Sequence, residues 1–358
     1  MASECNRHRI QAARTDAKSG SIEMLHFQIQ VFCSASCHMN EPIHYDIIGD
    51  IHGRFEKLAG LMDRMGYQRD GDGFIPPAGH KALFLGDLID PKLGYALPGG
   101  VRSTLQAVKW MTDAGHAHCL MGNHELNALY FHSKGPDGRW LRHHSDINKR
   151  MHQGTLTDFP DYEDPAGEWL AVWMPWMKSL PFTLDLGGFR MVHAAWHQES
   201  VDHLRGRNFD DECFFIAASD KSHPDGKAME ILLKGIEIEL PDDVIYTDPQ
   251  GNRRDHIRVR WWELPQNGMC YNELVFPANP MIPDDPVSEE SFAQIPSYPV
   301  NSPPVFFGHY LKPAISPLRP ERRNVACLDH SAATEGPLVA YRWRGENFIH
   351  SAQYISHE

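Results

Sequence analysis

Residues Lys81–Asp90, KALFLGDLID, are the stretch from which the fold and the chemistry of this chain can be worked out. The first half, Ala82–Leu85, is a short continuous apolar run, which is typical of a strand buried on both faces of a sheet. The run ends at Gly86, and Asp87 follows at once. Because reactive groups in open α/β sheets collect at the carboxyl ends of strands, we expect Asp87 to lie at such an edge.

The same arrangement occurs twice more along the chain. Ile47-Ile48 runs into GDIHG at residues 49–53, and CLM at residues 119–121 runs into GNHE at residues 122–125. Three apolar runs are therefore followed by polar residues of the metal-ligand type: Asp50, His52, Asp87, Asn123 and His124. One such loop could be an ordinary strand-to-loop turn, but the three together predict a shared site.

Composition and charge restrict the class of protein. The 358 residues are enough for one large domain or two ordinary ones, and 42% hydrophobic with 23% charged residues is typical of a globular protein. A formal net charge of -13 argues against binding to a nucleic-acid backbone or an anionic membrane. A phosphorylated substrate remains compatible with this charge, because a metal site supplies local positive charge.

The cysteines and the N-terminal residues bear on compartment and domain limits. The seven cysteines are scattered and form no CxxC motif, so we expect no disulfide framework and a cytoplasmic protein. Residues 1–38 are polar and poorly patterned, and we expect them to be a disordered tail. Met39 stands just before the first expected strand and could be the natural start. The folded domain is then expected over residues 39–358.

The rest of the chain adds two histidines to the candidate site. The second strand of a predicted hairpin, Phe189–Ala194, contains His193, and an apolar run at residues 305–307 leads into His309. Candidate ligands therefore extend over most of the chain, which predicts a single domain with insertions. The main insertion is expected at about residues 198–304, where the last part is acidic and proline-rich.

Three apolar segments near the C-terminus predict closing antiparallel strands: Val325–Leu328, Leu338–Trp343 and Phe348–Tyr354. Before them, strands and helices alternate over residues 45–132. The expected fold class is α/β, of the layered α+β type, with the site at the carboxyl ends of the strands.

The candidate ligands suit a centre of two divalent metal ions. Two metals about 3.5–4 Å apart need a bridging ligand, and the carboxylate of Asp87 suits this role. The other candidates would complete the two coordination shells: Asp50 and His52 at one metal, and Asn123, His193 and His309 at the other. A mixed set of carboxylate, imidazole and amide ligands favours manganese, with iron or zinc as alternatives, over calcium.

Five motifs in this order, GDIHG, GDLID, GNHE, HA at residues 193–194 and GH at 308–309, resemble the calcineurin-like metallophosphoesterases. Within them the chain is similar to the phosphoprotein phosphatases and their bacterial relatives, including diadenosine tetraphosphatases. The resemblance implies a central double β-sandwich flanked by helices. It also implies that His124 protonates the leaving oxygen and that Asp90 orients His124.

The sequence departs from the phosphatase pattern GDxxDRG, because Pro91 and Lys92 follow Asp90 where the pattern has an arginine. A transferring phosphoryl group usually needs such a cation. Arg260 is the first candidate and Arg258 the second, because IRVRWW at residues 257–262 alternates like a strand. Lys92 is the third candidate. A merely solvated strand face explains the two arginines equally well.

These expectations describe a two-metal phosphoesterase acting on phosphomonoesters, with phosphoserine and phosphothreonine proteins as the first substrate class. The alternative is a hydrolase of dinucleoside polyphosphates such as diadenosine tetraphosphate. An inactive fold that binds partners is a third possibility, but all six ligand positions and the acid pair are present. The expected partner is a phosphorylated protein or nucleotide, with no nucleic-acid backbone and no membrane.

Overall fold

The computed structural model describes residues 43–241, 244–247, 253–263, 266 and 268–358. Residues Glu41–Glu358 form one compact unit. The expected tail over residues 1–38 and the possible start at Met39 lie outside the described residues. None of the helices in the described part combines the length and apolar character needed to cross a membrane.

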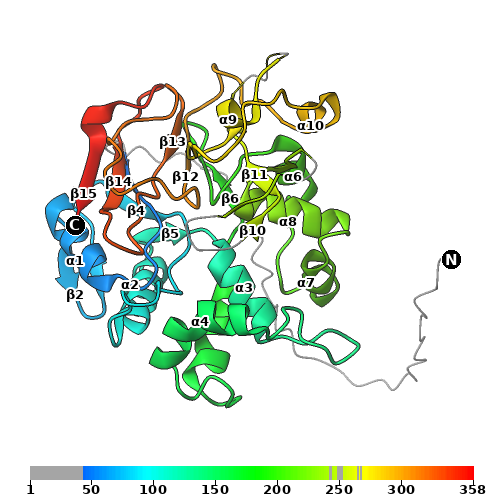
Figure 1. Cartoon of the computed structure of the whole chain (residues 1–358). Helices are drawn as coiled ribbons and strands as arrows, with labels where there is room; N and C mark the ends of the chain where they lie inside the picture. Colours follow the sequence, from blue (N-terminus) through cyan, green and yellow to red (C-terminus); the bar gives the residue numbers. More distant parts are fainter. Residues whose placement is uncertain (1–42, 242–243, 248–252, 264–265, 267) are drawn as a thin grey trace, which may run out of the picture. The chain divides into compact units, whose positions relative to one another are not determined.

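The first sheet contains the three apolar strands that precede the candidate ligands. Its strand order is β15-β14-β1-β4-β5. Figure 1 labels β15, β14, β4 and β5 of this sheet. Strands β1 (His44–Ile48), β4 (His80–Phe84) and β5 (Ala117–Cys119) are parallel neighbours. Helices α1 (Phe55–Met65) and α2 (Gly100–Asp113) connect them. Because the three strands are parallel, the loops that follow them emerge at the same edge of the sheet.

The second sheet has the order β13-β12-β7-β6. Strands β6 (Thr183–Asp185) and β7 (Arg190–Val192) form the predicted hairpin. Strand β12 (Val305–Phe307) is parallel both to β7 and to β13 (Val325–Cys327). The loops after β7, β12 and β13 therefore also emerge at one edge.

The two sheets pack against each other through alternate residues of their strands. Ile47 and Leu83 of the first sheet share a buried cluster with Met191 and Phe306 of the second. Their sequence neighbours belong to the other core cluster, which packs the outer faces against helices, as the alternation of side chains along a strand requires. The predicted double β-sandwich flanked by helices is confirmed.

Two predicted C-terminal strands differ from the structure. β14 (Leu338–Trp343) is antiparallel to β1 as expected, but β13 is parallel to β12. The last strand, β15, is Tyr354–His357 and follows a 3₁₀ turn at Ser351–Gln353. An apolar run indicates that a strand is buried, but it does not indicate the direction of its neighbours.

The strand expected at residues 257–262 is also shorter than predicted. Strand β11 covers only His256–Arg258, and it pairs with β8 (Glu237–Glu239). Trp261 and Trp262 are both buried. Two consecutive side chains in the same core do not fit the alternation of a regular strand, so the chain turns there.

Most of the remaining helices and strands are short, and α3, α4 and α8 are the longer helices among them. Those before β6 are β2 (Gln68–Asp70), β3 (Gly73–Ile75), α3 (Asn123–Phe131), α4 (Asp146–Asp158), the π-helix Trp169–Trp173 and α5 (Met174–Lys178). Those between β7 and β12 are, besides β8 and β11, α6 (Gln198–His203), α7 (Glu212–Ser219), α8 (Pro224–Lys234), β9 (Tyr246–Thr247), β10 (Arg253–Arg254), α9 (Tyr271–Leu274) and α10 (Glu289–Ala293).

Candidate active site

The six predicted metal ligands converge where the strands of the two sheets end. Asp87, after β4, lies between histidines from different loops. His52 Nε2 lies 3.7 Å from Asp87 Oδ2, and His193 Nε2 lies 3.4 Å from Asp87 Oδ1. Two possible metal-binding groups, one with His52 and His124 and one with His193 and His309, share Asp87. Because each carboxylate oxygen faces a different group, Asp87 has the geometry of a bridging ligand.

Hydrogen bonds fix the orientation of two of these histidine rings. His52 Nδ1 donates to the carbonyl oxygen of Ile89 at 3.0 Å, and His193 Nδ1 donates to that of Leu85 at 2.8 Å. When Nδ1 carries the proton of a neutral imidazole, Nε2 is left with its lone pair. A backbone carbonyl in this position is a frequent partner of a metal-binding histidine. Both rings therefore present Nε2 toward Asp87 as a ligand atom.

The other ligands include buried polar atoms without a partner. Asn123 Oδ1 lies 3.0 Å from His193 Nε2 and 2.7 Å from His309 Nδ1. Asp50 Oδ2 accepts the backbone N–H of His309 at 2.9 Å. Asp50 Oδ1 and His309 Nε2 are buried and have no hydrogen-bond partner among the residues described. Burying such atoms unpaired is costly, and cations bound between the loops would satisfy them.

The backbone around the site is held in an unusual conformation. Five non-glycine residues in the described part of the chain have a positive φ, and four are site candidates: His52 (51°), Asp87 (51°), Asp90 (61°) and His309 (64°). Each such residue costs on the order of 1–3 kcal/mol, and strain of this kind clusters at functional sites. At Gly308, a Cβ atom would lie 1.9 Å from Asp50 Oδ1, so this position requires glycine.

The charges of the site are unbalanced without cations. Burial, and then the charge of Asp329, raise the pKa of Asp50 well above its ordinary value. Burial also raises the pKa of Asp329 to about 6, with the charge of Asp87 acting in the same direction. Burial alone would lower the pKa of His193, but the Asp87 carboxylate raises it to about 10. The residues present therefore fit divalent cations, whose charge would offset these buried carboxylates.

The predicted acid pair lies beside this centre. His124 Nδ1 lies 2.8 Å from Asp90 Oδ2, while a ring nitrogen of His124 lies within 4.8 Å of the ligand atoms of His52 and Asp87. The other oxygen of Asp90 contacts His152 Nδ1 at 2.7 Å and accepts the hydroxyl of Thr155 at 2.6 Å, both from α4. Asp90 is therefore held from two sides, which fixes the carboxylate against His124.

Three residues around this site carry roles that were not predicted from the sequence. Glu125 is fully buried and accepts the backbone N–H groups of Asp87, Leu88 and Gly122 at 2.8–2.9 Å, which joins two ligand loops. Asp329 follows the apolar strand β13, as the candidate ligands follow their strands, so the same pattern could have identified it. His152 lies in a polar helix, and nothing in the sequence connects it with Asp90.

The three candidate cations of the substrate clamp differ in their relation to the site. Burial, and then the charge of Arg258, hold the pKa of His309 well below its usual range. Lys92 acts on the other side, where burial lowers the pKa of His52 to about 4 and Lys92 adds to the effect. Arg258 and Arg260 are both partly buried, and the Nε atom of each has no hydrogen-bond partner within the described residues, although Arg258 Nε forms an ion pair with Glu237 Oε1 at 3.2 Å. Arg258 and Lys92, the second and third candidates, therefore act electrostatically on residues of the site.

Residues 43–229, more than half of the chain, match the family model described as calcineurin-like phosphoesterase. The chain belongs to this family. Its ligand-bearing strands β1, β4, β5 and β7 lie inside the matched region, whereas His309 and Asp329 lie beyond it.

Curated relatives share parts of this chain. A bis(5'-nucleosyl)-tetraphosphatase PrpE [asymmetrical] from Geobacillus sp. (strain WCH70) is 27% identical over 190 residues, 51% of this chain and 69% of that protein. The protein of the same name from Geobacillus thermodenitrificans (strain NG80-2) is 38% identical over 88 residues, 25% of this chain and 33% of that protein. The chain thus spans about a third of the length of that second relative.

Solved structures also resemble this one. A cold-active protein-tyrosine phosphatase of a Shewanella species has 15% identity and a TM-score of 0.46, covering 89% of this chain and 81% of the other. A protein serine/threonine phosphatase from Saccharomyces cerevisiae has 13% identity and a TM-score of 0.41, covering 88% and 80%.

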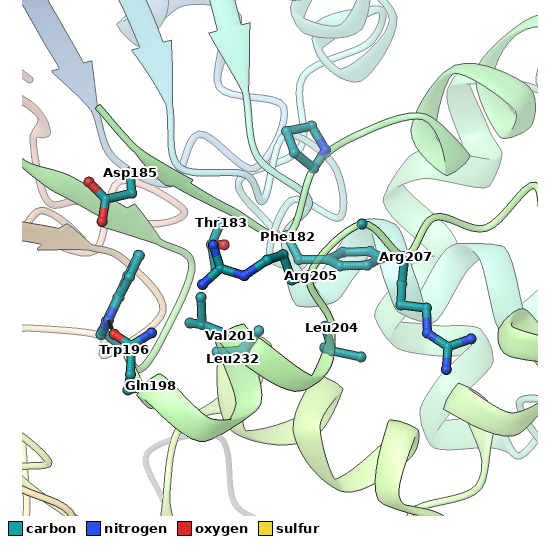
Figure 2. Close-up of a pocket in the computed structure, with 12 residues that line it drawn as sticks. Phe182, Thr183, Asp185, Trp196, Gln198, Val201, Leu204, Arg205, Arg207 and Leu232 are labelled. Atoms are coloured by element: carbon teal, nitrogen blue, oxygen red, sulfur yellow. Dashed lines mark hydrogen bonds between the residues drawn. The ribbon is translucent and has the colours of Figure 1, made fainter. Parts of the chain in front are cut away.

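A separate cavity of about 290 Å³ shares no lining residue with the metal centre. Figure 2 shows the side chains around it, which come from β6 and the residues just before it, the loop after β7, α6 and the loop after it, and α8. Its charged side chains are paired locally, because Arg205 pairs with Asp202 and Arg207 lies 4.0 Å from Asp211. Asp185, the remaining charged residue of the lining, is paired with Arg190.

Proposed function

We propose that this chain is a two-metal phosphoesterase whose metals are held by Asp50, His52, Asp87, Asn123, His193 and His309. The observation that carries the proposal is the position of Asp87, whose two oxygens face His52 and His193 at 3.7 and 3.4 Å. When bound, the two cations would activate water and polarise the phosphoryl oxygens. Manganese is our first choice, because the ligands mix imidazole, carboxylate and amide.

The chain's own residues supply the proton and the orientation. Burial alone would lower the pKa of His124, but the carboxylates of Asp87 and Asp90 raise it. His124 is then protonated over a wider pH range and can donate to the leaving oxygen. Asp90 holds the ring by its Nδ1, so the other ring nitrogen is left to face the substrate.

Two substrate classes are proposed for this site. Phosphoserine and phosphothreonine proteins are the first class, on the strength of the phosphatase-like motifs. Dinucleoside polyphosphates are the second, and the relatives named as bis(5'-nucleosyl)-tetraphosphatases support this class. For the compartment we propose the cytoplasm, supported by the free thiols of Cys119, Cys213, Cys270 and Cys327 in the described residues.

Metal removal tests the proposal directly. Exhaustive chelation should abolish phosphate release from p-nitrophenyl phosphate and lower the melting temperature, because the buried carboxylates then repel one another. Manganese should restore both. Full turnover by protein in which elemental analysis detects no metal would refute the two-metal site. A chelated sample should also be passed through a desalting column before manganese is added, so that residual chelator does not mask recovery.

The clamp gives a second prediction. Arg258→Ala should raise the KM for a phosphomonoester about ten- to a hundredfold, the loss expected for one charge-assisted contact, with metal content unchanged. Arg260→Ala is the matched control, since it removes the same group two residues away and should have the smaller effect. Inhibition by inorganic phosphate, measured on both variants, should weaken in parallel with KM. A larger effect of Arg260→Ala would show instead that Arg260, the first candidate from the sequence, binds the phosphoryl group.

A further inference from the structure

A narrow crevice lies between α3 and α4, next to the proposed proton donor. Its walls are one face of each helix, with His124, Asn127 and Phe131 on α3, and Asn148, Met151 and His152 on α4. Asp90 and Arg142 complete it. It encloses about 10 Å³, which is the room of about one water molecule or a single phosphate oxygen.

Arg142, in the loop between the two helices, is held in this crevice by neutral groups. Its Nη1 donates to Asn127 Oδ1 at 2.5 Å and its Nη2 donates to Asn148 Oδ1 at 2.9 Å. Its backbone N–H donates to the carbonyl of Tyr130 at 3.0 Å. Over the residues that the structure describes, the guanidinium forms no ion pair. It is therefore rigidly placed without being neutralised.

The carboxylates that influence Arg142 already have other partners. Burial lowers the pKa of Arg142, and the charges of Asp90 and Glu230 act in the opposite direction. Asp90 is committed to His124 and His152. Glu230 pairs with Lys221 at 2.7 Å and with Lys234. A partly buried guanidinium without a carboxylate of its own is costly, and an anionic ligand would offset that cost.

The position of Arg142 relates it to the leaving group. His124 lies in the first turn of α3, and Asn127, which orients Arg142, lies three residues further along the same face. The crevice therefore extends from the proton donor by three residues along the helix, or about 4.5 Å. A group that departs from phosphorus next to His124 would extend along this face, toward the guanidinium.

We propose that Arg142 binds a phosphate group of the leaving group, so that the preferred substrates are phosphoanhydrides with a polyphosphate leaving group, such as nucleoside polyphosphates. The inference rests on the proposed function and assigns its substrate class. In the reaction, the oxygen of water bonds to phosphorus and the P–O bond to the leaving phosphate breaks. His124 gives its proton to the leaving oxygen, and the proton released by water restores it.

Arg142→Gln tests the assignment against a matched control, Arg139→Gln, in the same loop. Arg139 is 86% exposed at its side chain and pairs only with Asp137 among the described residues. Each variant is assayed with diadenosine tetraphosphate and with p-nitrophenyl phosphate, whose leaving group has no phosphate. Arg142→Gln should lower kcat/KM about ten- to a hundredfold on the first substrate only, as expected for a lost charge-assisted contact. Arg139→Gln should change neither value.

The outcomes separate the inference from the function on which it rests. Wild-type protein that hydrolyses neither substrate would overturn both. Wild-type protein active on both, with Arg142→Gln equally impaired or equally active on the two, would overturn the inference alone. If Arg142→Gln is unstable, Arg142→Lys keeps the charge and loses the paired geometry. Partial retention of activity on diadenosine tetraphosphate by Arg142→Lys, with full activity on the aryl phosphate, would support the assignment. If Arg142→Lys shows no selective loss on diadenosine tetraphosphate, the assignment is contradicted.

Discussion

Asp87→Asn should bind neither metal tightly and should lose at least about 10³-fold in turnover, because metal ions supply several kcal/mol of transition-state stabilisation. The physical reason is the double role of the carboxylate. One oxygen faces His52 and the other faces His193. An amide at this position has only one oxygen and no charge, so it removes the ligand atom from one metal group and the negative charge from both. Elemental analysis of the purified variant, together with its kcat on p-nitrophenyl phosphate, measures both effects.

Asp90→Asn is the appropriate control for this prediction. Asp90 lies three residues after Asp87, is equally buried, and also has a positive φ, but it contacts His124, His152 and Thr155. We expect Asp90→Asn to keep near-native metal content while it loses rate. If Asp87→Asn binds two metals per chain as wild type does, Asp87 is not the bridge.

The convergence of the candidate metal ligands could be predicted from the sequence because local rules determine most of it. A buried parallel strand that ends in glycine and then a polar residue places that residue at the carboxyl edge, and this holds for Asp50, Asp87 and Asn123. The same rule applies to β13, and Asp329 was missed only because the run before it was taken for a closing strand. Direction was the missing information, since β13 is parallel to β12.

The surroundings of the acid pair could not be predicted, because they depend on how a distant helix packs. The proline that replaces the arginine of the phosphatase pattern is in contact with α4. A Cβ atom on Gly154 would lie 2.7 Å from the Pro91 ring, so only glycine allows this close approach. The approach brings His152 and Thr155 onto Asp90. The sequence of α4 gives no sign of this contact, since its glycine, histidine and threonine are unremarkable in a polar helix.

The arginines show the same limit. Alternation in IRVRWW correctly places Arg258 and Arg260 on the side away from the core, because Ile257 and Val259 are buried. It does not rank them, since the strand ends at Arg258 and the chain then turns. Arg142 carries no local signal either. Its environment is created by Asn127 and Asn148, which lie on two helices joined by the loop that contains it.

His124→Asn should lose about 10²–10⁴-fold in kcat on alkyl phosphates and keep its metals, because general acid catalysis contributes a factor of this size. The leaving oxygen of an alkyl phosphate is strongly basic and needs a proton as the bond breaks. The leaving group of an activated aryl phosphate is stable as an anion, so the same variant should lose much less on p-nitrophenyl phosphate. Rates on a series of phosphate esters, plotted against the pKa of the leaving group, should therefore have a steeper slope for the variant.

The control is one of the proposed ligands. His193→Asn removes a ring whose Nε2 faces both Asp87 and Asn123, and it should lose metal and impair all substrates alike. His124 lies among the same atoms, and a ring nitrogen within 4.8 Å of His52 and Asp87 could serve as a ligand. The acid role is favoured because His124 Nδ1 lies 2.8 Å from Asp90 Oδ2. Asp90, unlike Asp87, belongs to neither of the two possible metal-binding groups. Loss of one metal from His124→Asn, or an unchanged slope with leaving-group pKa, would assign His124 to the metal shell instead.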